Sequence, residues 1–546
     1  MMDLQPGQIP RSEAEALRLL HAKYDDGIGS GLYIPFIYPW VTFGAFLCFL
    51  YLLVPHNHSD FLKFMRYPIW LLNASLSIYL ILYSRARNSA PSFAVGLVAA
   101  WSLIWTATLM IFNDAQTDFK RIERSEGAHR RSKSFGNGAL HKKDDDAPKA
   151  DLRDDVDTTS ELNGHASGSP AYIGSYSWQS YPIAPFIERL DWITDLFCNF
   201  RGMGWNWRIS TIPPPPPWIQ EQIDRDSSEP VRPAKPTRLG LDGTRRYDNR
   251  GERLRQALLS FVKGYLAIDL LKVIITLDPY YWGRIDAPGP SFLPEFIRVS
   301  PVLTKAYRLT VCLYAMKTAL TWFFDMAPIF FVGLLGSDLI GARGEPWLYP
   351  DAFGSFSNVL DKGLAGWWGG WWHQSFRFAF EAPAKKLIGA YGWNPKSTSA
   401  KLLHLVVAFT LSGFLHAAGS YTQIGDTNPL SGPFLFFELQ TLGIIFQMLL
   451  IRLLRGAGIV QKSPKIIRRL GNFVYVHVWF YYTAPLLCDD FSRGGLWLFE
   501  PMPISPLRAL GFGPEGASWW CWTHQEDSWF VKWHRGKHWW QSGIAF

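Results

Sequence analysis

Two histidines in this chain stand where proton-transfer chemistry could be built. His416 lies inside an apolar segment, where an ionisable side chain is costly and is by default a candidate functional group. Small residues surround it over 411–420, and in a membrane helix they let another backbone or a ligand approach closely. Ser412 lies one helical turn earlier on the same face and can hydrogen-bond the imidazole. Two interpretations stay open at this point: a catalytic base, and a histidine that only hydrogen-bonds between helices.

The second histidine, His373, stands in an aromatic stretch, 371–377, which we call the Trp-His cassette: Trp-Trp-His-Gln-Ser-Phe-Arg. His373 and Arg377 are four residues apart, so on a helix they share a face. An arginine at a membrane surface suits phosphate recognition, because the paired N–H donors of its guanidinium bind phosphate oxygens bidentately. The alternative is an aromatic anchor at the membrane interface with a snorkelling arginine. Composition alone slightly favours the aromatic anchor.

No metal centre is expected. His404 precedes His416 by twelve residues, which places it about 120° around a helix, so the two would not share one face. The 5 cysteines are scattered and show no CxxC spacing. No Walker loop, GxSxG elbow, HExxH or EF-hand pattern occurs. Further ionisable residues in apolar segments, Asp269, Asp325 and Glu438, are more typical of ties between helices.

The elements that must position these residues are membrane helices. Aromatic residues make up 16% of the chain and charged residues only 18%, below the roughly 25% that is usual for globular proteins. Apolar runs of about 18 residues or more indicate membrane spans. We therefore expect an all-α polytopic membrane protein of eight or nine spans. Eight apolar runs are expected to span: 34–54, 67–83, 93–112, 256–277, 309–336, 402–418, 433–453 and 470–488. The segment 351–400 is broken by Gly and Lys, which favours re-entrant or interfacial placement.

The order of these runs divides the chain into five parts. A polar N-terminal segment (1–33) and a first transmembrane block (34–112) precede a polar insert (113–255). We expect the insert to be cytosolic and partly disordered, because residues 120 to about 170 have little apolar surface to bury. A transmembrane core (256–490) and a Trp-rich interfacial tail (491–546) follow. The net charge is +8, and the basic clusters flank the apolar runs. Their expected counterpart is therefore anionic lipid headgroups rather than nucleic acid.

A family resemblance emerges from the cassette and the His416 segment taken together. The residues that carry it are Trp368-Gly369, Trp372-His373-Gln374, Arg377 and Ser412-Gly413-Phe414-Leu415-His416. They resemble the wax-synthase-like branch of the membrane-bound O-acyltransferases, over about 345–420. Residues 201–205 (Arg-Gly-Met-Gly-Trp), with Trp347, Phe353 and Gly354, are similar to larger fungal members, some of which acetylate terpenoid or polyketide alcohols.

The resemblance implies a multi-helix bundle with a tunnel, in which acyl-CoA enters from the cytosol and an alcohol arrives from the membrane. His416 would then be the catalytic histidine and His373 a second catalytic residue near the thioester. The implied substrate-binding residues are Trp372, Gln374, Arg377 and Ser412. Among these, Gln374 would help His373 to stabilise the oxyanion, and Arg377 would contact the CoA phosphates. No metal or bound cofactor is implied, since acyl-CoA or acetyl-CoA is a co-substrate.

The expected function is acyl-CoA-dependent O-acyl transfer to an apolar alcohol, such as a fatty alcohol, sterol or terpenoid, in the endoplasmic reticulum membrane. The chain departs from the family pattern at two points. Gly370-Trp371 stands where basic residues are usual, and Ala417 follows His416 where an acidic residue is frequent. Two alternatives from other classes are a lipid or small-molecule transporter, which predicts inverted repeats and broken helices, and a non-catalytic membrane scaffold. The sequence indicates no oligomeric state.

Overall fold

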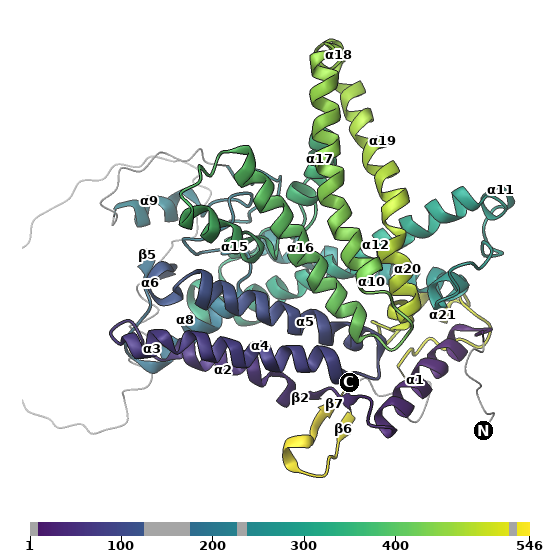
Figure 1. The fold of residues 1–546 in the computed structure, drawn as a ribbon, viewed down its shortest axis with the longest axis horizontal. Helices are drawn as coiled ribbons and strands as arrows, with labels where there is room; N and C mark the ends of the chain where they lie inside the picture. The colour runs from purple at the N-terminus through teal and green to yellow at the C-terminus, as the bar shows by residue number, and fades with distance from the viewer. Residues whose placement is uncertain (1–8, 125–174, 226–236, 523–531, 546) are drawn as a thin grey trace, which may run out of the picture.

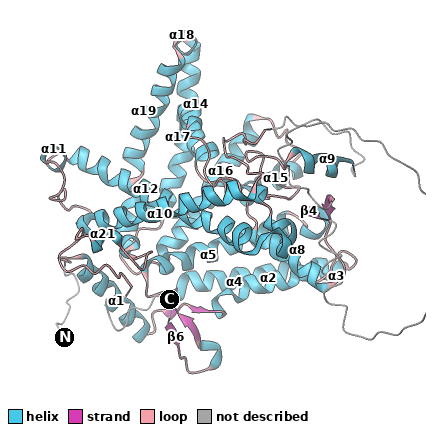
Figure 2. Ribbon diagram, turned by 180° about the vertical axis from the view of Figure 1, so that it is seen from behind, coloured by secondary structure: helices cyan, strands magenta, loops and turns pink. Residues whose placement is uncertain are grey.

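The computed structural model describes residues 9–124, 175–225, 237–522 and 532–545. Helices dominate this part of the chain, and three small sheets join distant segments (Figures 1 and 2). The all-α fold class predicted from composition is therefore confirmed for the described residues. The sheets are the parallel pair β1 (Ile34–Pro35) and β3 (Ser84–Arg85), the antiparallel pair β4 (Arg121–Arg124) and β5 (Tyr176–Gln179), and the antiparallel triplet β2 (Ile37–Tyr38), β7 (Gly543–Ala545) and β6 (Lys532–His534).

The first transmembrane block forms three helices that lie side by side (Figure 1). They are α2 (Phe43–Leu53), preceded by the 3-10 turn η1 (Trp40–Thr42), α4 (Arg66–Tyr83), and α5 (Ser89–Ala107), which continues through the π turn η2 (Thr108–Phe112). The amide of Asn73 on α4 is buried and donates to the hydroxyls of Ser102 (3.2 Å) and Thr106 (3.0 Å) on α5. Such polar contacts between apolar helices fix their register.

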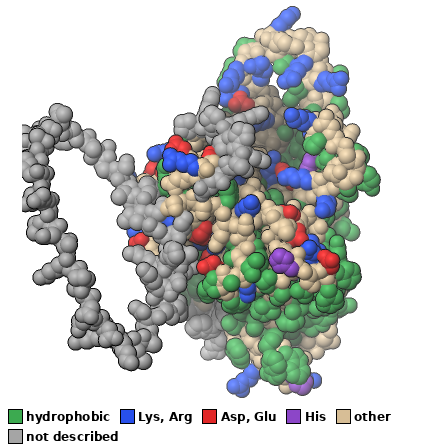
Figure 3. All heavy atoms as spheres, turned by 90° about the vertical axis from the view of Figure 1, so that its left-hand side faces the viewer, with side chains coloured by type: hydrophobic (Ala, Val, Ile, Leu, Met, Phe, Trp, Pro, Cys, Tyr) green, Lys and Arg blue, Asp and Glu red, His purple; other side chains and the backbone are tan. Residues whose placement is uncertain are grey.

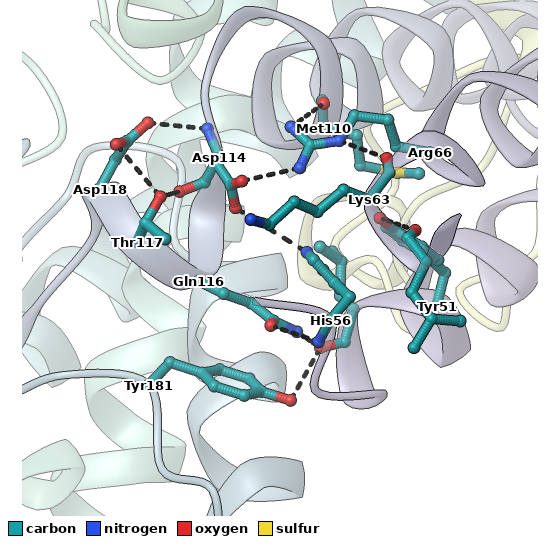
Figure 4. A network of polar contacts seen from close by, with 12 residues as sticks. Tyr51, His56, Lys63, Arg66, Met110, Asp114, Gln116, Thr117, Asp118 and Tyr181 are labelled. Atoms are coloured by element: carbon teal, nitrogen blue, oxygen red, sulfur yellow. Dashed lines mark hydrogen bonds and ion pairs between the residues drawn. The ribbon is translucent and has the colours of Figure 1, made fainter. Parts of the chain in front are cut away.

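A polar network closes the far end of α2 (Figure 4). Asp114, just after η2, accepts a hydrogen bond from Arg66 at 2.7 Å and lies 3.8 Å from Nε2 of His56. The Gln116 amide donates to two carbonyl oxygens at the end of α2, both at 2.9 Å, so these helix-end acceptors are satisfied. Burial opposes ionisation of Asp114, but the nearby His56 and the hydrogen bond from Arg66 outweigh it and hold the pKa of Asp114 well below its usual range.

The described part of the insert packs into the protein core. It contains α6 (Ala115–Asp118), the β4–β5 pair, α8 (Phe186–Cys198) and α9 (Pro217–Arg225). Trp192, Trp205 and Trp207 are buried, and Trp207 stacks on Phe378 of the later core with ring centroids 4.3 Å apart. The insert thus contributes to the same hydrophobic cluster as the transmembrane block. Residues 125–174, which hold most of the stretch predicted to be disordered, lie outside the described residues.

The transmembrane core is built from longer helices. They are α10 (Arg250–Leu277), α12 (Pro301–Pro328), α14 (Ser357–Gly366), α15 (Arg377–Ala390), α16 (Thr398–Thr422), α17 (Leu435–Gly456), α19 (Lys465–Thr483) and α20 (Pro485–Gly494). Two further helices, α1 (Glu13–Gly29) and α3 (Asp60–Phe64), precede this core. Short helices and turns connect the core helices: η3 (Pro279–Trp282), α11 (Glu295–Arg298), η4 (Ile329–Leu335), α13 (Gly336–Ile340), η5 (Gly341–Gly344), η6 (Pro346–Leu348), η7 (Trp367–Trp371), η8 (Leu430–Phe434) and α18 (Ile459–Lys462). After the core come η9 (Leu496–Leu498), α21 (Pro506–Ala509) and η10 (Trp539–Gln541).

Helices occur at all eight runs that hydropathy predicted to span. Four helical stretches in the described part of the chain are long and apolar enough to cross a membrane: 89–112, 301–344, 398–422 and 430–456. A shorter apolar helix covers Trp40–Leu53. The total of eight or nine spans therefore stays a prediction. In 351–400 the chain forms short helices with a break at Gly363, whose φ of 62° is left-handed and suits glycine.

Helix α16 is held against α5 by an unusually close backbone approach. A Cβ on Gly96 would lie 1.9 Å from the carbonyl oxygen of Ala418, so no larger residue fits at position 96. Similarly, a Cβ added to Gly419 would lie 2.7 Å from the ring of Phe93. The small residues after His416 thus serve helix packing, as the sequence suggested for membrane helices in general.

The acidic residues predicted to tie helices together behave differently from one another. Asp325 on α12 pairs with Arg253 on α10 at 3.4 Å, and Asp269 on α10 accepts hydrogen bonds from Ser505 and from the backbone N–H of Leu507 (2.9 Å). Both are ties, as predicted. Glu438 has a buried Oε1 with no hydrogen-bond partner among the described residues, so the structure shows no tie there.

Candidate active site

The Trp-His cassette forms a tight connection between η7 and α15. Helical geometry ends at Trp372, whose ψ is 152°. The Gln374 amide then donates to the carbonyl oxygens of Trp368 and Trp372, both at 2.7 Å, and its own oxygen accepts from Arg377 at 3.2 Å. The side chain of Gln374 is buried, and both its amide nitrogen and its oxygen form hydrogen bonds within the turn. This turn sets the position of His373.

Two glycines let a second loop close over the cassette. The N–H of Gly354 donates to the carbonyl oxygen of Trp371 at 3.0 Å. A Cβ on Gly354 would lie 1.9 Å from the Gly370 carbonyl oxygen, and a Cβ on Gly370 would lie 2.7 Å from the Asn358 side chain. Glycine is therefore required at both positions, which brings Phe353 against the cassette.

His373 sits in a wall of aromatic rings. The ring centroids of Phe376, Trp372, Phe324 and Phe353 lie 5.6, 5.6, 5.8 and 5.9 Å from that of the imidazole. Its Nδ1 is buried and has no hydrogen-bond partner among the described residues. Burial, followed by the nearby charges of His416 and Arg201, lowers the pKa of His373 from 6.5 to about 3. The ring is therefore neutral at pH 7.

His416 is held in one tautomer by its own helix. Its Nδ1 lies 2.8 Å from the carbonyl oxygen of Ser412. A carbonyl oxygen can only accept, so Nδ1 carries the proton and Nε2 presents a lone pair. Nε2 has no hydrogen-bond partner among the described residues, and the ring is half-buried. Phe437 on α17 covers it with ring centroids 4.4 Å apart. In this tautomer Nε2 can accept a hydrogen bond or a proton.

The structure brings the two histidines into one neighbourhood. The proximity of His416 is among the causes of the lowered pKa of His373. The ring of Trp368 links them, because it contacts Trp372 beside His373 (6.2 Å) and Phe437 over His416 (5.7 Å). Helices α15 and α16, which follow the cassette and carry His416, also pack together (Figure 1).

Comparison with known proteins finds a family match over the same residues. Residues 349–439, which include both histidines, match the family model described as "Membrane bound O-acyl transferase family". Over this stretch the chain is similar to members of that family. The resemblance seen in the sequence is therefore confirmed. No solved structure matches the chain.

Several curated proteins that the chain resembles are fungal transferases. The chain is 25% identical over 303 residues to an acetyltransferase of Rhodocybe pseudopiperita, covering 55% of this chain and 66% of the relative. It is 25% identical over 308 residues to an O-mevalon transferase of Penicillium terrestre (54% and 61%), and 29% identical over 164 residues to an acetyltransferase of Hericium erinaceus (30% and 41%). Each match spans less than two thirds of the relative's own length.

The other site residues predicted from the sequence lie around the pair but use their polar atoms in other ways. Arg377 donates from Nε to Glu381 at 2.7 Å, and Glu381 also binds Lys385 at 2.9 Å. Its guanidinium is thus partly occupied by its own helix. Ser412 contacts His416 through its main chain rather than its hydroxyl. Trp372 packs edge-on against Phe353 at 5.4 Å.

Other candidate ligands do not gather into a metal site. In the part of the chain that the structure describes, no cluster of three or more His, Cys, Asp or Glu side chains has metal-binding geometry. His404 lies on α16 with a buried Nδ1 that has no partner among those residues. His477 on α19 is exposed, and its Nδ1 contacts the carbonyl oxygen of Phe473 on its own helix.

Two cations near His373 were not assigned a role from the sequence. Arg201, in the turn after α8, donates to the carbonyl oxygens of Asp351 (2.8 Å) and Pro350 (3.2 Å), and forms no ion pair among the described residues. Burial lowers the pKa of Arg201 to about 10, so it stays charged at pH 7. The ammonium of Lys317 on α12 lies 4.9 Å from the centre of the Phe353 ring. Residues 201–205 were noticed only as a family feature, since 150 residues separate Arg201 from the loop that it braces.

The buried Gln374 amide makes a testable contribution to stability. In Gln374→Met the carbonyl oxygens of Trp368 and Trp372 lose their donor inside the protein, which costs about 1–3 kcal/mol. We expect a lower Tm for the purified variant in detergent. Gln461→Met is the matched control, because the Gln461 amide makes one exposed contact with the carbonyl oxygen of Arg455. Equal Tm values for the two variants would contradict the bracing role.

The lowered pKa of His373 predicts how stability depends on pH. The unfolded chain binds a proton at this residue below pH 6.5, whereas the folded protein does not until about pH 3. Stability is therefore lost as pH falls below 6.5, and it rises again toward neutrality. His21, whose pKa is lowered to about 4 mainly by burial, acts in the same direction. We expect Tm measured from about pH 4 to about pH 8 to rise less steeply in His373→Phe than in wild type; an unchanged slope would show that His373 is not buried as a neutral ring.

Proposed function

We propose that this protein is an acyl-CoA-dependent O-acyltransferase that esterifies the hydroxyl of an apolar alcohol. The observation that carries the proposal is the fixed tautomer of His416, which leaves Nε2 free beside a second, neutral histidine. The family match over both histidines and the relatives called acetyltransferase and O-mevalon transferase support it. Fatty alcohols, sterols and terpenoids are the acceptor classes that we propose, in the endoplasmic reticulum membrane.

His416 is proposed as the general base. Nε2 takes the proton from the alcohol as its oxygen attacks the thioester carbonyl carbon, and the tetrahedral intermediate collapses with cleavage of the C–S bond. The departing CoA thiolate then receives the proton from the imidazolium, so the products are the ester and free CoA thiol. General base catalysis of this kind is typically worth about 10²–10⁴-fold in rate.

His373 is proposed to stabilise the oxyanion of the intermediate. Because its ring is neutral, one nitrogen carries a proton that can be donated while the other only accepts. Its Nδ1 is buried, so Nε2 is the nitrogen proposed to meet the substrate and to carry the donated proton. A donor that is fixed before the reaction starts stabilises developing charge without reorganisation. The positive charge of Arg201 acts in the same sense, because it is close enough to influence His373.

The remaining residues are proposed to shape and hold the site. Gln374 positions His373 through the cassette turn, and Trp372 lines the wall that excludes water from the thioester. Arg377 is proposed to contact CoA phosphates with the donors that Glu381 and Gln374 leave available. The Ser412 hydroxyl is free of the His416 contact and is proposed to meet the alcohol. An acetyl donor agrees with the acetyltransferase relatives.

The experiment that tests this function is a product search in membranes. Membranes from cells that express the full chain would be incubated with isotope-labelled acetyl-CoA or long-chain acyl-CoA and an extract of host alcohols and sterols. We expect labelled esters whose mass reports both the acyl group and the acceptor. The matched control is the same membrane with His416→Ala. A label that appears in no ester, with any donor, would overturn the proposal.

A further inference from the structure

The C-terminal end of the described chain folds back onto the start of α2. Strand β7 pairs with both β2 and β6, so β6, the following turn and β7 form a hairpin, residues 532–545, anchored beside the first transmembrane block (Figure 1). The indole N–H of Trp40 donates to the carbonyl oxygen of Ser542 at 2.8 Å, and the Trp40 and Trp539 rings meet edge-on at 5.0 Å. These contacts fix the hairpin at one end of α2.

A cleft of about 580 Å³ opens between this hairpin and the start of α2. Its aromatic lining includes Trp40, Trp533 and Trp539, and its basic lining includes Arg535 and Lys537. No acidic side chain lines it among the described residues. Trp533 and Trp539 are 67% and 69% exposed, although large aromatic residues are normally covered. The cleft thus combines unneutralised cations with uncovered indole rings.

The surroundings place this cleft at the level of a membrane surface. The helix that starts at Trp40 is apolar over Trp40–Leu53, and it exposes Phe43, Phe46 and Leu50 along its outer face. The polar network of His56 and Asp114 closes its other end. Seen from the side, the lower part of the molecule is mostly hydrophobic, with basic and histidine side chains at its lowest point (Figure 3). Indoles and basic side chains at the end of an apolar helix are typical of headgroup depth.

We propose that the cleft between the hairpin and α2 binds the headgroup of an anionic phospholipid. The guanidinium of Arg535 and the ammonium of Lys537 contact the phosphate, and the exposed indoles of Trp533 and Trp539 pack on the glycerol and first acyl carbons. The absence of acids from the described lining favours an anionic over a zwitterionic lipid. This inference does not depend on the proposed acyl transfer.

The test uses the full-length protein in lipid nanodiscs made of phosphatidylcholine alone or of equal parts phosphatidylcholine and phosphatidylserine. Lipid that stays bound after release from the nanodisc is counted by native mass spectrometry. We expect wild type to retain phosphatidylserine in preference, and Arg535→Gln/Lys537→Gln to retain several-fold less. Arg452→Gln/Arg455→Gln on α17 is the matched control and should behave as wild type.

The outcomes separate the proposed site from its alternatives. Equal retention of phosphatidylserine by the hairpin variant and wild type would overturn the proposal, and so would an equal loss in the α17 control. Loss of phosphatidylserine with addition of free inorganic phosphate would show a phosphate site rather than a lipid site, which also overturns it. Acyl transfer measured in the same preparations is expected to stay unchanged in the hairpin variant, because these residues lie outside the histidine site.

Discussion

His416→Ala is expected to lower the rate of ester formation by roughly 10²–10⁴-fold at equal protein level, because the alcohol then has no base for its proton. The loss should appear in kcat, while KM for acyl-CoA stays close to wild type, since the imidazole acts on the acceptor. The measurement is the initial rate of labelled ester formation in membranes that carry each variant.

Ser412→Ala is the matched control for this prediction. The carbonyl oxygen that orients His416 belongs to the main chain and survives the substitution. We therefore expect Ser412→Ala to keep kcat within a few-fold of wild type. A higher KM for the alcohol would support contact between the Ser412 hydroxyl and the acceptor. Loss of kcat in Ser412→Ala comparable to that in His416→Ala would contradict the assigned orientation of the imidazole.

The second large effect is expected at His373. His373→Ala should lower kcat by about 10²–10³-fold, the usual consequence of removing one donor from an oxyanion site. His373→Phe separates this role from that of an aromatic anchor, because it keeps a ring among Phe324, Phe353 and Phe376 but removes both nitrogens. The catalytic account predicts that both variants are equally inactive. An active His373→Phe protein would show that the cassette is an anchor.

His477→Ala controls for the loss of a histidine in general. Its ring is exposed on α19 and contacts only its own helix through Phe473 among the described residues. We expect wild-type kcat and wild-type KM for both substrates. A large loss of activity in this variant would show that the assay responds to changes outside the site.

The helices were predictable from composition because a membrane helix needs only an apolar run of sufficient length. Each predicted run falls on a helix, and the 93–112 and 402–418 runs lie within stretches long enough to span. Hydropathy alone does not bring His373 and His416 together, and only the family resemblance implied that they share one site. The structure shows how they are linked, through the contacts of Trp368 with Trp372 and Phe437.

The sequence was less informative about which polar atoms remain free. Gln374 and Arg377 were both predicted to face substrate, yet their hydrogen bonds mainly join the cassette to itself and to Glu381. Hydropathy described the insert as polar and partly disordered and did not predict that Trp192 and Trp207 from it are buried. A window average cannot distinguish a polar loop from one that carries a few anchoring tryptophans. Arg201 was missed as a site residue because the loop that it contacts lies 150 residues away in the sequence.

The most direct test of the central claim is whether consumption of the thioester depends on both an acceptor hydroxyl and His416. Purified protein would be mixed with labelled acyl-CoA, with and without the alcohol identified in the product search, and free CoA thiol and ester would be measured together. We predict that wild type releases thiol and forms ester in equal amounts only when alcohol is present, and that His416→Ala does neither. Ester formation by His416→Ala at the wild-type rate would contradict the account.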